Sequence, residues 1–229
     1  MFQVATNEGQ FRQHSPLPRP VAETWDMPRD EWKDVGHGKD LDRTAALLED
    51  AGVPRDYNWW FIAPPDDQRE RMAVVAAEGL RAAGWENVTV RRLDWGPFLE
   101  TYVSGDEADY NVYALGWDGS PDPDTFTYYL LARTPDVLGV TNGTFYGADG
   151  GNGEDVSSAL VRARRTADRP KRKRLYGDAI TTVLEDRVHI PVYNGGRSHA
   201  VADHVDGFDV HPRGGMELFG SYTDTAVGN

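Results

Sequence analysis

Three carboxylates lie within one short segment of the chain. Asp118, Asp122 and Asp124 belong to the sequence DGSPDPD, which joins an alternating apolar run to an aromatic stretch. Clustered carboxylates can bind an ammonium group, hold a cation, or act as the acid and base of a glycoside hydrolase. Asp and Pro are also ordinary turn residues, and Asp122 could simply cap a helix that begins near Pro123. The residue types alone leave these interpretations open.

The residues on either side of this acidic segment predict a strand and a helix. Residues 110–117 alternate in the way that is typical of a strand, and residues 125–132 form an aromatic helix. The carboxylates would then follow the carboxyl end of a strand, where open α/β sheets bind their ligands. The sequence therefore predicts a ligand-binding turn at this place.

The pattern of the acidic segment does not favour a metal site. Asp118, Ser120, Asp122 and Asp124 alternate as in a calcium loop, but Pro123 stands where the EF-hand turn needs Gly. The 6 histidines are dispersed and cysteine is absent, so zinc and thiolate sites are not expected. A phosphate loop and a dinucleotide fingerprint are also lacking. We expect neither a metal nor a cofactor.

The elements upstream predict how the turn is held. Residues 58–63 and 87–95 have the pattern of strands, and residues 67–83 have the pattern of a helix between them. This order implies parallel strands joined by a right-handed crossover. The predicted fold class is α/β, with a mixed, mostly parallel sheet flanked by helices. Further helices are expected at 40–51, 97–103, 154–166 and 169–187, a buried strand at 189–193 and another strand at 198–209.

The two ends of the chain and one basic run stand apart from this pattern. Residues 1–38 are rich in proline with little apolar periodicity, so we expect an irregular leader that Trp25 and Trp32 anchor. Residues 213–229 are glycine-rich and predict no element. The run RARRTADRPKRKR at 162–174 straddles a helix junction, and we interpret it as a solvated face and not as a nucleic-acid surface.

Composition and charge narrow the classes of partner. Acidic residues number 37 and basic residues 24, which gives a formal charge of −13. Nucleic acid and anionic membranes are poor partners for such a surface, because binding a polyanion needs clustered cations. Dense carboxylates are tolerable where salt screens them, so we expect a halophilic, haloarchaeal source. The opening MFQVATNEGQFRQ has the pattern of neither a signal peptide nor a membrane span.

The order of several motifs resembles one protein family. From residue 16 onward the chain carries PLPRP, DRTAALLEDAG, LRAAGW, VTVRRLDWGPFLETY, YALGWDGSPDPDTF, EDVSSALVRARRTADRPKRKRLYGDA and HIPVYNGGRSHAV. Their order and spacing resemble the C-terminal lobe of the extracellular solute-binding proteins of family 5. These proteins are the dipeptide, oligopeptide and nickel receptors of ABC importers. The resemblance covers nearly the whole chain.

The resemblance implies one lobe of a periplasmic-binding-protein-like type II fold, of the cluster C kind, in which two lobes close over a ligand. Residues 1–38 would be a leader that crosses from a missing N-terminal lobe, residues 39–212 the α/β C-terminal lobe, and residues 213–229 a tail that returns. The implied protein is not an enzyme. Its implied partners are a peptide or other small solute, ABC permease subunits and the missing lobe, with no nucleic acid. It would be extracellular and anchored to the cell surface, with the signal and lipid anchor absent from this chain.

The resemblance also implies which residues meet the ligand. In peptide-binding members, an aspartate shortly after the Gly-Trp of this strand pairs with the α-ammonium group of the peptide. Gly116 and Trp117 match that motif, but the usual aspartate position falls on or near Ser120, so Asp118 or Asp122 would take the role. An oligosaccharide ligand stacked on aromatic rings, and a glycan hydrolase that uses the clustered carboxylates, stay as alternatives. The predicted ligand-binding residues are Trp95, Trp117, Asp118, Ser120, Asp122 and Tyr128.

Overall fold

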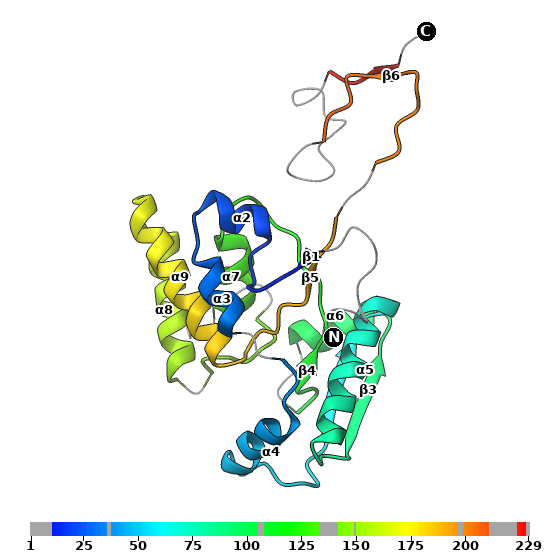
Figure 1. Cartoon of the computed structure of the whole chain (residues 1–229), viewed down its shortest axis with the longest axis vertical. Coiled ribbons are helices and arrows are strands. Elements are labelled where there is room, and N and C mark those ends of the chain that lie inside the picture. Colours follow the sequence, from blue (N-terminus) through cyan, green and yellow to red (C-terminus); the bar gives the residue numbers. More distant parts are fainter. Residues whose placement is uncertain are drawn as a thin grey trace.

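Two groups of elements make up most of the fold, as Figure 1 shows. The structure is a computed structural model, and it describes residues 11–35, 38–104, 108–132, 142–148, 150–196, 199–210 and 224–227. One group is a parallel sheet with the helices that cover it, and the other is a layer of helices. The chain passes from the sheet to the helical layer through the acidic segment.

A three-stranded parallel sheet is the centre of the first group. Its strands β2 (Trp59–Ala63), β3 (Val88–Arg92) and β4 (Val112–Tyr113) lie in the order β3-β2-β4. The central strand β2 pairs in parallel with both neighbours. Helix α5 (Asp67–Ala82) connects β2 to β3 and packs on both. The prediction of a parallel strand–helix–strand unit is therefore confirmed.

Helices cover both faces of this sheet. Phe61 and Ala63 of β2 pack in a cluster with α5 on one face. Ile62, which points the other way, packs in a second cluster with Phe98 and Tyr102 of α6 (Trp95–Ser104). Side chains alternate along a strand, so a strand that is buried on both faces needs an uninterrupted apolar sequence. The apolar run WWFIA meets this requirement.

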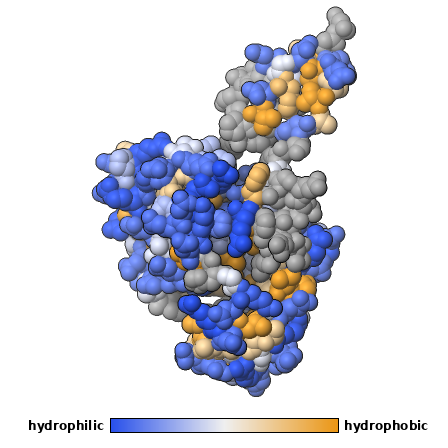
Figure 2. Space-filling view, viewed as in Figure 1, coloured by the Kyte–Doolittle hydropathy of each residue, from blue (hydrophilic) through white to orange (hydrophobic). Residues whose placement is uncertain are grey.

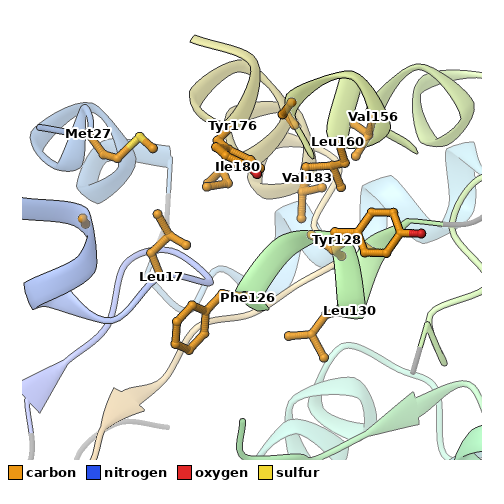
Figure 3. Packing of buried hydrophobic residues seen from close by; sticks show 14 of the residues in the cluster. Leu17, Met27, Phe126, Tyr128, Leu130, Val156, Leu160, Tyr176, Ile180 and Val183 are labelled. Atoms are coloured by element: carbon orange, nitrogen blue, oxygen red, sulfur yellow. The ribbon is translucent and has the colours of Figure 1, made fainter. Parts of the chain in front are cut away.

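The second group is a helical layer with the largest core of the described residues. Helices α7 (Asp124–Leu131), α8 (Asn152–Arg164) and α9 (Arg169–Glu185) pack on one another. Figure 3 shows their apolar side chains meeting, with Tyr176 and Ile180 of α9 fully buried. These three helices were predicted from the sequence to within two residues at each end.

The proline-rich leader also belongs to this helical layer. It forms two short helices, α2 (Arg19–Thr24) and α3 (Arg29–Val35), so the prediction of an irregular segment is wrong for them. Pro20 lies in the first turn of α2, where the missing N–H of proline costs no helical hydrogen bond. Trp25 is 6% exposed and Trp32 is 1% exposed, which confirms both as anchors. The division of the chain at residue 38 stays a prediction.

Aspartates begin three of the helices. Asp40 accepts a hydrogen bond from the N–H of Arg43 and starts α4 (Leu41–Asp50), as predicted. Asp66 and Asp168 cap α5 and α9 in the same way. A carboxylate at this position satisfies free N–H groups and favours the positive end of the helix dipole. Three of the acidic residues therefore stabilise helix starts.

The chain approaches and leaves the helical layer at adjacent points. Strand β1 (Phe11–Arg12) pairs in an antiparallel manner with β5 (Tyr193–Asn194). The prediction of a buried strand at 189–193 is wrong, because Ile190 is 61% exposed and only the last of those residues lies in β5. Pro191 has no N–H to give to a sheet, so the pairing begins after it.

A small hairpin follows β5 along the chain. Strands β6 (Val205–Asp206) and β7 (Ala226–Val227) pair in an antiparallel manner, and Figure 1 shows them away from the two main groups. The strand predicted at 198–209 is confined to β6. Most of the predicted tail, residues 211–223, lies outside the described residues. In the described part, no helix has the length and apolar character that crossing a bilayer requires.

Figure 2 shows how polar and apolar residues share one face of the molecule. Hydrophilic residues cover α2, α3, α8 and α9 on that face. Hydrophobic residues gather in the lower part of the view, around α4 and α5. The helix α4 buries no residue, and its Leu47 is 58% exposed.

Stability should depend on pH through His189. Burial lowers the pKa of His189 to about 4, and its Nδ1 has no hydrogen-bond partner within the described part of the chain. The unfolded chain therefore binds this proton more readily than the folded chain between about pH 6.5 and about pH 4. The free energy of unfolding should fall as pH falls through this window, by up to about 3 kcal/mol. Urea unfolding at a series of pH values measures it.

A His189→Gln variant should lose this component of the pH dependence. His204→Gln, at an exposed position, is the matched control and should keep the slope of the parent protein. An unchanged slope in His189→Gln would show that His189 titrates normally in the folded state.

Candidate functional site

The carboxyl ends of the three parallel strands meet at one edge of the sheet. Beyond this edge, Trp95 begins α6 shortly after β3, and Trp117 and Asp118 lie on the loop after β4. Trp95 is 46% exposed and Trp117 is 39% exposed, which is unusual for tryptophan. Asp118 is exposed as well. This carboxyl edge brings together three of the six predicted ligand-binding residues, one from the start of α6 and two from the loop after β4.

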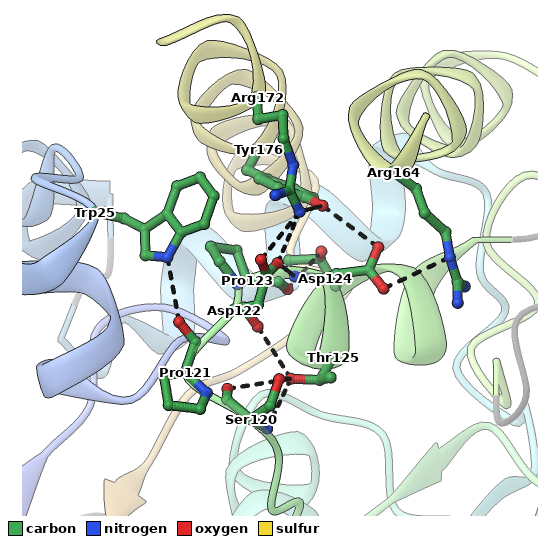
Figure 4. Close-up of polar contacts among 11 residues, drawn as sticks. Trp25, Ser120, Pro121, Asp122, Pro123, Asp124, Thr125, Arg164, Arg172 and Tyr176 are labelled. Carbon is green, nitrogen blue, oxygen red and sulfur yellow. Dashed lines mark hydrogen bonds and ion pairs between the residues drawn. The ribbon is translucent and has the colours of Figure 1, made fainter. Parts of the chain in front are cut away.

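The turn after β4 is fixed from within by Thr125. The hydroxyl of Thr125 accepts from the N–H of Ser120 at 3.1 Å and donates to the carbonyl of Asp122 at 3.0 Å, as Figure 4 shows. The indole N–H of Trp117 donates to the carbonyl of Thr125 at 2.7 Å. Trp117 is thus held in one orientation although much of its ring is exposed. Ser120 is half-buried, and its backbone serves the turn.

Asp122 is held by an arginine of the helical layer. Both of its carboxylate oxygens lie 3.0 Å from Nη2 of Arg172, and one of them also accepts from the N–H of Asp124. The Arg172 guanidinium lies over the rings of Trp25 and Tyr176, at 5.1 and 5.5 Å from their centroids. Asp122 thus pairs with a cation and also accepts a hydrogen bond from the first N–H of α7. The interpretation of Asp122 as a helix-start residue fits this geometry better than a ligand contact.

Asp124 points into the layer of helices. Its side chain is 14% exposed, lies 3.7 Å from Nε of Arg164, and accepts from the hydroxyl of Tyr176 at 3.3 Å. Burial raises the pKa of the Asp124 carboxyl, and the Arg164 cation opposes that rise. Because Asp122 and Asp124 have partners inside the protein, they do not form the open pair of carboxylates that a glycoside hydrolase needs.

Tyr128 is a correction to the predicted site. It is 8% exposed, and the Arg164 guanidinium lies 4.2 Å from its ring centroid. A ring that is buried in the core and covered by a cation offers no stacking surface to a ligand. Sequence periodicity could not show this, because the covering residue comes from α8.

The basic run at 162–174 also differs from its prediction. Arg164 and Arg172 hold the acidic segment, Lys173 pairs with Asp26 at 2.5 Å, and Arg169 lies over the ring of Trp25. The interpretation as a wholly solvated face is therefore wrong. Opposite charges in the sequence, DGSPDPD and RARRTADRPKRKR, were a signal for this contact.

Arg69 is a residue at the carboxyl edge that the sequence analysis missed. It lies in the first turn of α5, directly after β2. Its guanidinium lies against Gly116, where an added methyl group would collide with it. Its Cζ lies 5.7 Å from the ring centroid of Trp95. The position just after a predicted strand at the ligand-binding edge was the available signal.

A metal centre finds no support in this geometry. Within the described residues, no three His, Cys, Asp or Glu side chains are grouped so that they could hold a metal ion. Asp122 and Asp124, which belong to the calcium-like spacing of the acidic segment, instead contact arginines.

Comparisons with known proteins identify the fold. The structure is similar to the ABC transporter-associated periplasmic binding protein DppA of Helicobacter pylori in complex with peptide STSA, with a TM-score of 0.62 and 20% identity over 90% of this chain and 40% of that chain. It is similar to a dipeptide-binding protein of a Pseudoalteromonas species in complex with Met-Leu, with a TM-score of 0.64 and 22% identity over 89% of this chain and 38% of that chain. It is also similar to the oligopeptide-binding protein AppA of Bacillus subtilis in complex with a nonapeptide. Here the TM-score is 0.61, with 17% identity over 94% of this chain and 46% of that chain.

These similarities show that the chain has the fold of one part of a periplasmic binding protein, with a parallel sheet flanked by helices. The chain spans about two fifths of the length of the first of these proteins. No protein-family model matches the chain, and no curated protein sequence matches it.

The Asp122–Arg172 contact should stabilise the fold. In Asp122→Asn, the largely covered Arg172 loses its counter-charge, and the free energy of unfolding should fall by about 1–3 kcal/mol. Asp118→Asn removes the same charge from an exposed position and should change it by no more than about 0.5 kcal/mol. Urea unfolding in one buffer measures both variants. Equal effects of the two substitutions would contradict the structural role of Asp122.

Proposed function

We propose that this chain is the C-terminal lobe of the substrate-binding component of an ABC importer. It would bind peptides or a similar small solute and deliver them to the membrane permease. The fold supports this, and so do the three similar structures, which by their names are peptide-binding or transporter-associated proteins that hold peptides. The observation that carries the proposal is the exposed group of Trp95, Trp117 and Asp118 at the carboxyl edge.

The proposed ligand contacts follow from the chemistry of these side chains. Asp118 pairs with an ammonium group of the ligand, and the pair strengthens when a closing cleft excludes water. Trp117, fixed by its bond to Thr125, and Trp95 supply apolar walls. Asp122 takes no part, because Arg172 already holds it.

The proposed action is a shift between open and closed forms. A ligand that contacts two lobes favours the closed form, and the permease recognises that form. The second lobe would be the part of such a protein that this chain, which spans about two fifths of the first similar structure, does not cover.

We further propose that the protein works outside the cell, anchored at its surface, and in high salt. The charge of −13 supports the halophilic part of this proposal. The ion pairs of Asp122 and Asp124 with arginines support a binding protein over a glycan hydrolase. An oligosaccharide is the second candidate ligand, because two exposed tryptophans are also the stacking surfaces that sugars use.

Calorimetric titration with peptides and oligosaccharides tests the ligand class. The chain is titrated together with the second lobe, in high salt, with di- to hexapeptides and with short glucans. We expect peptide binding that Asp118→Asn weakens by about 1.5–3 kcal/mol, as for a charged hydrogen bond. Asp155→Asn, at an exposed position of α8, removes an equal charge and should leave the affinity unchanged.

The outcomes separate the proposals. Heat from the glucans alone would replace the peptide with a sugar as ligand. Equal peptide affinity in Asp118→Asn and the parent protein would remove Asp118 from the site. Release of product from chromogenic glycosides would contradict a function in binding alone.

A further inference from the structure

Two segments of the chain carry the Asn-x-Thr pattern that N-glycosylation requires. One begins at Asn87 and the other at Asn142. The pattern is short and recurs by chance, so the surroundings of each asparagine decide whether it can carry a sugar. These surroundings differ between the two segments.

The segment at Asn87 is open to solvent. Asn87 directly precedes β3, and both Asn87 and Thr89, which supplies the hydroxyl of the pattern, are exposed. In the strand order β3-β2-β4, β3 is an edge strand, so no further strand of the described chain covers its outer side. A glycosyltransferase can therefore reach both the amide and the hydroxyl.

The amide nitrogen of Asn87 can accept a sugar without losing its contact in the fold. Its Nδ2 donates to the carbonyl of Asp56 at 3.0 Å, and Asp56 is itself exposed. An asparagine amide has two N–H groups. A sugar replaces one of the two hydrogens, so the other can keep the bond to Asp56.

The surroundings of Asn142 oppose the same modification. Asn142 is half-buried, its Nδ2 donates to the carbonyl of Leu131 at 3.1 Å, and its Oδ1 accepts from the hydroxyl of Thr144 at 2.6 Å. Gly143, which lies between them, is buried, and its carbonyl accepts from the hydroxyl of Tyr110 at 2.8 Å. The amide and the hydroxyl of this segment are thus both engaged within the fold.

We propose that Asn87 is an N-glycosylation site and that Asn142 is not modified. This rests on the proposal that the protein works outside the cell, because this modification is made on exported chains. In the transfer, a bond forms between Nδ2 of Asn87 and C1 of the first sugar of a lipid-phosphate-linked oligosaccharide. The bond between that C1 and the phosphate oxygen breaks, the phosphate leaves with its lipid, and Nδ2 gives up one proton.

A glycan at Asn87 leaves the candidate ligand site open. Asn87 lies at the amino end of β3, whereas Trp95 follows its carboxyl end. The five residues of β3 separate these two edges by about 15 Å, at about 3.3 Å for each residue. The glycan instead adds hydrophilic bulk beside an edge strand, where the sheets of separate molecules can pair. Its expected effect is therefore on solubility and not on peptide affinity.

Mass spectrometry of the natural protein tests the inference. The protein that contains this chain is purified from the cells that naturally make it and is digested with trypsin, which cleaves after lysine and arginine. Asn87 then lies in the peptide 82–91, and Asn142 lies in the peptide 134–162. We expect the first peptide to exceed its sequence mass by the mass of an oligosaccharide, and the second to have its sequence mass.

Two substitutions at position 89 provide a matched pair, expressed in the same cells. Thr89→Val removes the hydroxyl with little change of shape and should abolish the added mass, whereas Thr89→Ser keeps a hydroxyl and should retain it. Asn87→Gln should also abolish the added mass, and Asn142→Gln should change nothing. In calorimetric titration, the peptide affinity of Thr89→Val should equal that of the parent protein.

Several results would overturn the inference. If the protein is recovered from the cell surface with an unmodified peptide 82–91, Asn87 is not a glycosylation site, although the proposed location stands. If the unmodified protein is recovered from the cell interior, the proposed location fails together with the inference. Sugar on Asn142 would show that the folded surroundings do not select the site. Weaker peptide binding by Thr89→Val would contradict the separation of the glycan from the ligand site.

Discussion

The contact between Arg172 and Asp122 joins three parts of the fold that are distant in the sequence. Arg172 comes from α9, Asp122 from the turn after β4, and the ring of Trp25, over which the guanidinium lies, follows α2. The indole N–H of Trp25 in turn donates to the carbonyl of Pro121. This one cluster fixes the path by which the chain leaves the sheet and begins the helical layer. The orientation of the exposed residues before it, Trp117 and Asp118, depends on that path.

The cluster also explains why the aspartates of one short segment differ in role. Asp122 and Asp124 lie beyond the point where the turn meets α8 and α9, and arginines of those helices neutralise them. Asp118 lies before that point, on the loop at the sheet edge. The same residue type is thus a structural group on one side of the turn and a proposed ligand group on the other. Their environment, and not their spacing, separates them.

The arginines of the helical layer and the arginine at the sheet edge differ in their contacts. Arg164 and Arg172 each lie close to an acidic partner and to aromatic rings, so their charge is used within the helical layer. Arg69 has an aromatic neighbour in Trp95 but no acceptor at hydrogen-bond distance in the described chain. Within the described residues, a buried Nε without a hydrogen-bond partner is shared by Arg69, Arg91 and Arg172.

The sequence by itself determined most of the local elements and the edge of the sheet at which the candidate site lies. The apolar run of β2, the helical spacing of α5 and caps such as Asp40 predicted these and most other elements, because they depend on neighbours a few residues away. It did not determine the burial of Tyr128, the helices of the proline-rich leader or the role of Asp122. Each of these depends on a residue far along the chain, such as Arg164 or Arg172, which only the tertiary structure brings into contact. Arg69 was overlooked for the same reason, because its meeting with Gly116 requires the strands to be aligned in parallel.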